Sequence, residues 1–243
     1  MSAGDAVVVA LVIAASGTVQ LAAGFGFALA SVPLLSIALS PHEAVVVALA
    51  LATFTNAYQA YSGRQETDRG VTGRMLAGAL VGLPIGLLVY RAADERVLGV
   101  LVGVAVLAAI GVTARGVDLR RAGPRLDLAG GVVSGALTTS VGTNGPPLVF
   151  VLQARRFEPD RFRATITSVF FVLDVLSVAV FAATGEIDRN ILLAVGAALP
   201  GLAVGAAVGI WLRRFLDPRR FARLVLVVLL AAAVSSIVTA LTR

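Results

Sequence analysis

The sequence predicts an all-α polytopic membrane protein in which two inverted repeats each contribute about five hydrophobic segments. Composition is the first observation: 58% of the 243 residues are hydrophobic, 14% are charged and the mean hydropathy is +0.93. The second is an internal repeat in which glycine, leucine and proline recur 118 residues later. The matched positions are Gly17 and Gly135, Gly24 and Gly142, Leu34 and Leu152, and Pro41 and Pro159. In both copies a short apolar run stops at a glycine cluster and resumes at once, which is typical of transporters that bind substrate between two halves.

Hydropathy places ten segments along the chain. They lie near residues 6–23, 27–39, 43–61, 74–90, 97–114, 127–141, 146–154, 163–184, 190–212 and 221–242. Segments 27–39 and 146–154 are too short to cross about 30 Å of hydrocarbon as straight helices, because each residue adds only about 1.5 Å. We therefore expect half-helices or parts of tight hairpins, so that the helices are broken or re-entrant at the glycine motifs.

An arginine-rich linker divides the ten segments into two halves. We expect a first transmembrane repeat at residues 1–114, a cytoplasmic linker at 115–125 and a second transmembrane repeat at 126–243. An odd number of crossings in each half gives the two halves opposite orientations, which is why the repeats are expected to be inverted.

Arginine distribution predicts the topology. All 20 basic residues are arginines, and 16 of them fall in loops that the ten-segment arrangement puts on one side. These loops are residues 62–74, 115–125, 155–163 and 213–223. Basic loops remain cytoplasmic, so both termini are predicted to be external. The N-terminus has no positive region, and we expect no signal peptide.

Several function classes are disfavoured by what the sequence lacks. With no cysteine and a single histidine, His42, neither a thiolate nor a multi-histidine metal site can form, and no metal or cofactor is expected. Lysine and a phosphate-binding loop motif are absent, so direct use of ATP is unsupported. The arginines follow membrane topology rather than a nucleic-acid surface. A membrane-embedded enzyme would need a catalytic cluster within the segments, and none is visible.

Two segments carry glycine at every fourth residue. These are Gly78, Gly82 and Gly86 in the first half and Gly201, Gly205 and Gly209 in the second. Such spacing makes a flat helix face that another backbone can approach closely. We expect packing within the chain. A homodimer interface and direct contact with substrate are the alternatives.

The glycine breaks are candidates for an anion site. A helix that restarts after Gly24–Gly26 or Gly142–Gly145 presents unpaired backbone N–H groups and the positive end of its dipole. With opposed repeats, the two breaks meet near the membrane midplane. The substrate-binding candidates are Gln20, Gly24, Gly26, Asn56, Gly142, Thr143, Asn144 and Gly145. Alternatively, the glycines only allow helices to cross.

Asp174 is the one carboxylate in the middle of an apolar segment, and it matches Asn56 at the offset of 118. An ionisable group at that depth is a functional hypothesis by default. We expect proton coupling or gating. The alternatives are a carboxyl that bridges helices through hydrogen bonds, or a position on the lipid side.

The motifs resemble those of a known family. The run from Gly24 to Leu35 looks like the first signature of the TauE/SafE family, the sulfite exporter or toluenesulfonate uptake permeases, and the run from Ser140 to Leu148 resembles the second. The segment that leads from Arg69 to the glycines at 78, 82 and 86 fits the middle of the family pattern. Phe27 and Asn144 stand where the family often has further glycines.

The resemblance implies a secondary transporter that moves sulfite or an organosulfonate across the bacterial inner membrane. Its partners would be a small anionic substrate and the lipid bilayer, without nucleic acid. An anion channel or facilitator for another small anion is the alternative, since the same breaks could line a pore.

Overall fold

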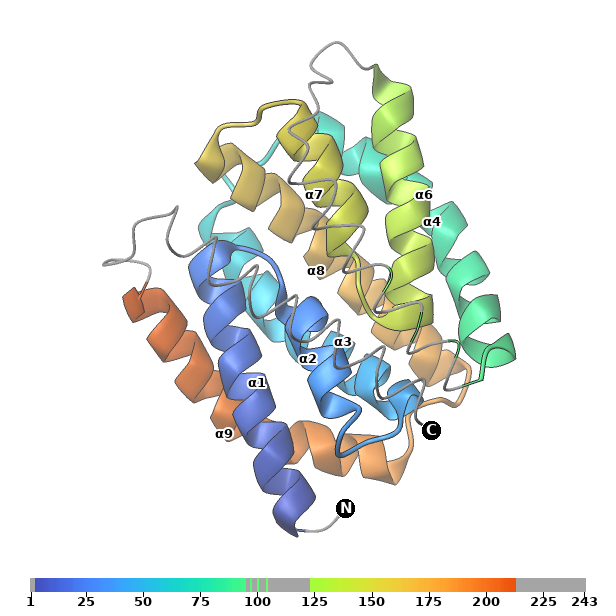
Figure 1. Cartoon of the computed structure of the whole chain (residues 1–243). Helices are drawn as coiled ribbons and strands as arrows, with labels where there is room; N and C mark the ends of the chain where they lie inside the picture. The colour runs from blue at the N-terminus through green and yellow to red at the C-terminus, as the bar shows by residue number, and fades with distance from the viewer. Residues whose placement is uncertain (1–2, 95–96, 98–99, 101–103, 105–122, 213–243) are drawn as a thin grey trace.

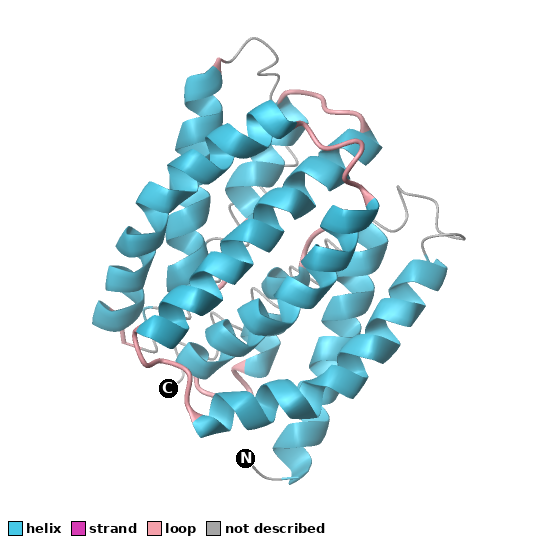
Figure 2. Cartoon of the chain, turned by 180° about the vertical axis from the view of Figure 1, so that it is seen from behind, coloured by secondary structure: helices cyan, strands magenta, loops and turns pink. Residues whose placement is uncertain are grey.

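The computed structural model describes residues 3–94, 97, 100, 104 and 123–212, and within these ranges the protein consists of helices and short connections without strands (Figures 1 and 2). Most of the predicted segment 97–114, all of segment 221–242, the loop 213–223 and most of the linker 115–125 lie outside the described residues. The other eight predicted segments are all helices.

The helices repeat almost residue for residue. The first half contains α1 (Ala3–Ala23), α2 (Phe27–Leu35), α3 (Pro41–Ser62) and α4 (Arg69–Ala92). The second half contains α6 (Pro124–Val141), α7 (Gly145–Ala154), α8 (Pro159–Ala183) and α9 (Arg189–Leu212). The ends of α1 and α6, the starts of α2 and α7, and the starts of α3 and α8 are each 118 residues apart. The internal repeat is therefore a repeat of secondary structure.

Local sequence explains where these helices begin and end. Ser40 and Glu43 form a capping box at the start of α3, and Pro41 occupies the first helical position. His42 is the next residue of the helix. Gly24 and Gly142 follow α1 and α6 with φ of 86° and 71°, a left-handed conformation that glycine adopts without strain and that ends a helix.

Five of the helices are long and apolar enough to cross a membrane: α1, α3, α4, α8 and α9. α2 and α7 contain 9 and 10 residues, so each is about 15 Å long, half of what a crossing requires. α6 carries Arg125 and Asp127 near its start and is not among the five. Exposed leucines, valines and Trp211 cover the outer faces of α4 and α9, as expected for helices that contact lipid.

The glycine faces pack within the chain. α4 lies along α6 and α9 lies along α1, on opposite sides of the molecule (Figure 1). A Cβ added to Gly82 would overlap the Val132 carbonyl oxygen, and one added to Gly205 would overlap that of Ala14. Intramolecular packing is therefore confirmed. The glycine faces considered for a homodimer are occupied by helices of the same chain.

The glycine contacts between the halves occur twice, with the halves exchanged. The contacts on one side are Gly78 with Leu128, Gly82 with Val132 and Gly86 with Ala136. Those on the other side are Gly201 with Ala10, Gly205 with Ala14 and Gly209 with Thr18. The partners Leu128, Val132 and Ala136 lie 118 residues after Ala10, Ala14 and Thr18. Exchanged contacts of this kind are what a two-fold relation between two similar units produces.

The central pair of helices consists of α3 and α8, which are equivalent in the two halves. Asn56 of α3 contacts Asp174 of α8, whereas Gly63, just after α3, lies against Ala164, near the start of α8. Moving forward along α3 therefore means moving backward along α8, so the two helices are antiparallel.

Candidate functional site

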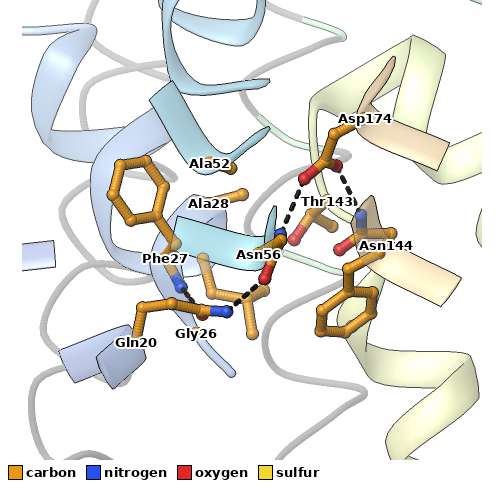
Figure 3. A pocket seen from close by; sticks show the side chains of 12 residues that line it. Gln20, Gly26, Phe27, Ala28, Ala52, Asn56, Thr143, Asn144 and Asp174 are labelled. Carbon is orange, nitrogen blue, oxygen red and sulfur yellow. Dashed lines mark hydrogen bonds between the residues drawn. The ribbon is translucent and has the colours of Figure 1, made fainter. Parts of the chain in front are cut away.

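A small cavity lies where the two helix breaks meet (Figure 3). The first half contributes Gln20 of α1, the start of α2 and two residues of α3. The second half contributes the connection between α6 and α7 and two residues of α8. The lining residues are Gln20, Gly26, Phe27, Ala28, Leu29, Ala52, Asn56, Thr143, Asn144, Gly145, Phe170 and Asp174. The cavity volume is about 10 Å³, enough for roughly one water molecule.

Most of the lining comes from equivalent positions of the two halves. Four pairs are 118 residues apart: Gly26 and Asn144, Phe27 and Gly145, Ala52 and Phe170, and Asn56 and Asp174. The cavity therefore lies on the axis that relates the repeats. Each pair differs chemically, and three of the four combine a small residue with a larger one. The paired residues therefore occupy equivalent positions but carry different side chains.

The break before α2 is held by a side chain. Gly26 has φ of 103°, a conformation in which only glycine is unstrained. The turn directs the Phe27 backbone N–H, the first of α2, at Gln20 Oε1, which accepts at 3.1 Å. The N-terminal end of α2 thus points into the cavity, and the Gln20 side chain of α1 caps it.

Asp174 is fully buried and joins three elements (Figure 3). Asn56 Nδ2 donates to its Oδ2 at 2.7 Å, and Asn144 Nδ2 donates to its Oδ1 at 2.9 Å. The lipid-side position is therefore wrong, and the bridge between helices that the sequence left as an alternative is present. A bridging carboxyl can still bind a proton, so proton coupling remains a prediction.

Side-chain amides extend the bridge into the first half. Gln20 Nε2 donates to Asn56 Oδ1 at 2.6 Å and to Gln59 Oε1 at 3.1 Å. Gln59 Nε2 in turn donates to the Gln20 carbonyl at 3.2 Å. Gln59 does not line the cavity, but it holds the orientation of a residue that does.

Thr143 brings a hydroxyl with no hydrogen-bond partner to the same cavity. Its side chain is 1% exposed and Oγ1 contacts no donor or acceptor. A buried hydroxyl without a partner costs free energy, on the order of 1–3 kcal/mol. Such a group is well suited to a ligand that completes its hydrogen bonding.

The structure brings together most of the site residues that the sequence selects. Those that line the cavity are Gln20, Gly26, Asn56, Thr143, Asn144, Gly145 and Asp174. Gly24 and Gly142 do not. A Cβ on Gly24 would meet the Arg163 side chain, and one on Gly142 would meet Val32 and Val45. These two glycines shape the backbone turns on either side of the cavity instead of facing it.

The sequence reasoning missed the apolar part of the lining. Ala52 lies one turn before Asn56, and Phe170 lies one turn before Asp174, so helical spacing from the two polar residues would have found them. No group of three carboxylates, histidines or cysteines able to hold a metal occurs among the described residues.

Comparison with known proteins places the chain in a family. Residues 9–236 match the family model described as "Sulfite exporter TauE/SafE". The chain is 25% identical over 206 residues to the "Probable sulfite/organosulfonate exporter TauE" of Cupriavidus necator, covering 82% of this chain and 79% of that protein. It is 32% identical over 166 residues to the "Probable inner membrane transporter protein TsaS" of Comamonas testosteroni, covering 67% of this chain and 70% of that protein. No solved structure matches significantly.

The matched region contains both glycine breaks, all the cavity residues and every helix from α2 to α9. Its relatives are named as transporters, and the apolar helices together with the inner-membrane relative support a multi-pass protein of the inner membrane. The chain therefore belongs to the TauE/SafE sulfite exporter family of membrane transporters, as the glycine motifs predicted.

Proposed function

We propose that this protein is a secondary transporter that moves a small sulfur-containing anion, sulfite or an organosulfonate, across the bacterial inner membrane. The observation that carries the proposal is the cavity in which the starts of α2 and α7 meet beside the unpartnered Thr143 hydroxyl. The names of the two relatives supply the substrate class, since one of them is described as a sulfite and organosulfonate exporter.

The chemistry of the cavity suits an anion without a buried arginine. The starts of α2 and α7 contribute positive dipole ends, and α7 offers the Gly145 N–H before Pro146 and Pro147, which have none. Thr143 contributes a hydroxyl, and Gln20 and Asn144 contribute side-chain amides. Glycine at positions 26 and 145 leaves the backbone open to close approach.

Inverted repeats explain how such a site alternates between the two sides. Equivalent helices α3 and α8 are antiparallel, so a two-fold axis that relates them is perpendicular to both. In a membrane that both helices cross, that axis lies in the membrane plane, which supports inversion. We further propose the division at residues 1–114, 115–125 and 126–243, with α4 and α9 each packed on the opposite half.

A carrier is favoured over a channel by the size of the cavity. A volume of about 10 Å³ holds one water molecule, whereas a sulfonate is several times larger. The cavity in the described conformation is therefore too small for the anion. Binding requires it to widen, and separation of the two halves on one side, which is the movement of a carrier, would provide the room.

Arginine distribution supports the orientation. With the loops 62–74, 115–125, 155–163 and 213–223 in the cytoplasm, 16 of the 20 arginines lie inside and both termini lie outside.

Equilibrium binding of sulfite and a sulfonate to detergent-purified protein tests the site. We expect Asn144→Ala to weaken binding by about 1–3 kcal/mol, because a hydrogen bond to a charged ligand is lost. Gly26→Ala should prevent binding, since its φ of 103° strains any residue with a Cβ. Gly123→Ala is the matched control, because Gly123 has no atom within 4 Å of an added Cβ and does not line the cavity. Folded Asn144→Ala and Gly26→Ala proteins that bind like the parent would show that the site lies elsewhere.

A further inference from the structure

We propose that Gln20 and Asn56 form a relay of side-chain amides through which protonation of Asp174 turns the Phe27 N–H from a capped donor into an anion-binding donor. The inference rests on the proposed anion site and adds the way in which a proton controls it. It assigns Gln20 and Asn56 as positioning residues that act between the proton site and the anion site.

The relay runs in one direction in the described structure. The Phe27 N–H donates to Gln20 Oε1, Gln20 Nε2 donates to Asn56 Oδ1, and Asn56 Nδ2 donates to Asp174 Oδ2 (Figure 3). A backbone N–H can only donate and an ionised carboxylate can only accept. The two ends therefore dictate the orientation of both amides when Asp174 is ionised.

Protonation of Asp174 changes this end of the relay from a hydrogen-bond acceptor to a donor. When Asp174 takes up a proton from water on Oδ2, this oxygen becomes a donor and needs an acceptor. Asn56 supplies one by rotating its amide so that Oδ1 faces Asp174, which turns Nδ2 toward Gln20. Gln20 then rotates in the same way and presents Oε1 to Asn56. No covalent bond other than the new O–H forms or breaks, the hydrogen bonds of the two amides are exchanged, and each amide keeps its volume.

The reversed relay changes what Phe27 meets. Gln20 Nε2 now points where Oε1 had been, so two donors, Nε2 and the Phe27 N–H, converge with no acceptor between them. An anion oxygen at that point accepts from both, and hydrogen bonds to an ionised acceptor are stronger than those between neutral groups. Without the proton, the Gln20 oxygen occupies the N–H and repels an anion. One proton and one anion therefore bind together.

Gln59 opposes the reversal. In the described orientation it accepts from Gln20 Nε2 and donates to the Gln20 carbonyl. Turning the Gln20 amide brings two amide oxygens face to face unless Gln59 gives up its bond to that carbonyl. Gln59 therefore stabilises the state that does not bind the anion, so that an anion alone does not turn the relay.

The surroundings leave Asp174 as the titrating group of the cavity. The groups that face its carboxyl from the neighbouring elements are the neutral amides of Asn56 and Asn144. Among the described residues, the charged and titratable groups of α8 and of the helices packed on it lie toward helix ends and do not line the cavity. They are His42, Glu43, Tyr58 and Tyr61 on α3, Arg69, Arg74, Tyr90 and Arg91 on α4, Arg125 and Asp127 on α6, and Asp160, Arg161 and Arg163 on α8 itself.

Equilibrium binding of methanesulfonate at a series of pH values tests the relay, because this anion stays ionised throughout. In the parent protein we expect the dissociation constant to rise about tenfold per pH unit once Asp174 loses its proton. Gln20→Met removes the amide that caps Phe27 but leaves Asp174 and both of its amide donors in place. Binding should weaken in this variant, because one donor is lost, and should show little dependence on pH. Thr53→Val, which removes an α3 hydroxyl bonded to its own helix at Leu49, should keep the parent profile.

A second variant and a second measurement make the test independent of the folding of Gln20→Met. Gln59→Leu should tighten binding about fivefold and keep the pH dependence, because the described orientation loses two hydrogen bonds. Proton uptake in weak buffer should approach one per anion in the parent and none in Gln20→Met. If the dissociation constant of the Gln20→Met protein still rises tenfold per pH unit, the Asp174 carboxylate repels the anion directly. That result would overturn the relay but not the proposed anion site. A Gln59→Leu protein with unchanged or weaker binding would also overturn it. A folded parent that binds no sulfonate at any pH would overturn the proposed anion site together with the relay.

Discussion

Asn56 and Asp174 occupy equivalent positions of the two repeats and are joined by a hydrogen bond of 2.7 Å. Residues that meet their own equivalents lie on the axis that relates the repeats. One repeat places an amide there and the other a carboxyl, so the symmetric backbone carries an asymmetric pair. The protein thereby has one ionisable group at the centre of its site instead of two carboxylates that would repel each other.

Asp174→Asn should abolish the dependence of transport on a pH gradient while the protein remains folded. Asparagine keeps an acceptor oxygen and the shape of the carboxyl, but its side-chain amide does not take up a proton near neutral pH. Flux of a sulfonate into proteoliposomes, with and without an imposed gradient, measures the effect. Asp174→Ala is a poorer probe, because it leaves the Asn56 and Asn144 amides without their acceptor. Normal gradient-driven flux in Asp174→Asn would remove the coupling role.

Gly82→Ala should destabilise the protein by about 1–3 kcal/mol, because the new methyl group overlaps the Val132 carbonyl and forces α4 away from α6. Gly73→Ala, on the same helix, has no atom within 4 Å of its added Cβ and should be neutral or slightly stabilising. Thermal unfolding in detergent compares the two variants. Equal melting temperatures would mean that close packing of α4 on α6 contributes little to stability.

Cysteine labelling should place the loop after α3 and the loop before α9 on opposite sides of the membrane. The chain has no cysteine, so single substitutions at Gln65 and Arg189, both exposed, give unambiguous sites. An impermeant thiol reagent applied to intact cells should label Arg189→Cys and should reach Gln65→Cys only after the membrane is opened. The reverse pattern would invert the proposed orientation.

Asp68 should make stability depend on pH at the start of α4. Partial burial by itself would raise the pKa of Asp68, but hydrogen bonds from the Val71 N–H and Arg161, together with the Arg161 charge, outweigh it and lower the pKa. A lowered folded-state pKa gives stability that is present above the unfolded value, about 3.9, and is lost as pH falls through the folded value.

Replacing Asp68 separates its two roles. Asp68→Asn keeps a helix cap but loses the charge, so its melting temperature should fall below that of the parent at neutral pH and approach it in acid below about pH 4. Asp68→Ala should cost about 1 kcal/mol at every pH through loss of the cap to Val71. Glu66→Gln, at an exposed position of the same loop, is the control. A difference between Asp68→Asn and the parent that does not change with pH would contradict the charge effect.

The sequence by itself determined the helices, the breaks and the repeat. Glycine at positions 24 and 142 ends a helix because it adopts positive φ, and Ser40 with Glu43 starts one because the capping box is local. Hydropathy identifies membrane segments because a helix needs a long apolar run to cross the hydrocarbon. The offset of 118 is enough to pair Asn56 with Asp174, since both residues are read directly from the chain.

Only the tertiary structure decided which surfaces meet. The flat glycine face of α4 is visible in the sequence, but its partner α6 belongs to the other half, and local spacing contains no information about so distant a contact. The same holds for the cavity: Gly24 and Gly142 share the motif with Gly26 and Gly145, yet only the latter two line it. The direction of the Gln20 and Asn56 amides likewise follows from a backbone N–H at one end and a carboxylate at the other, which the fold brings together from separate helices.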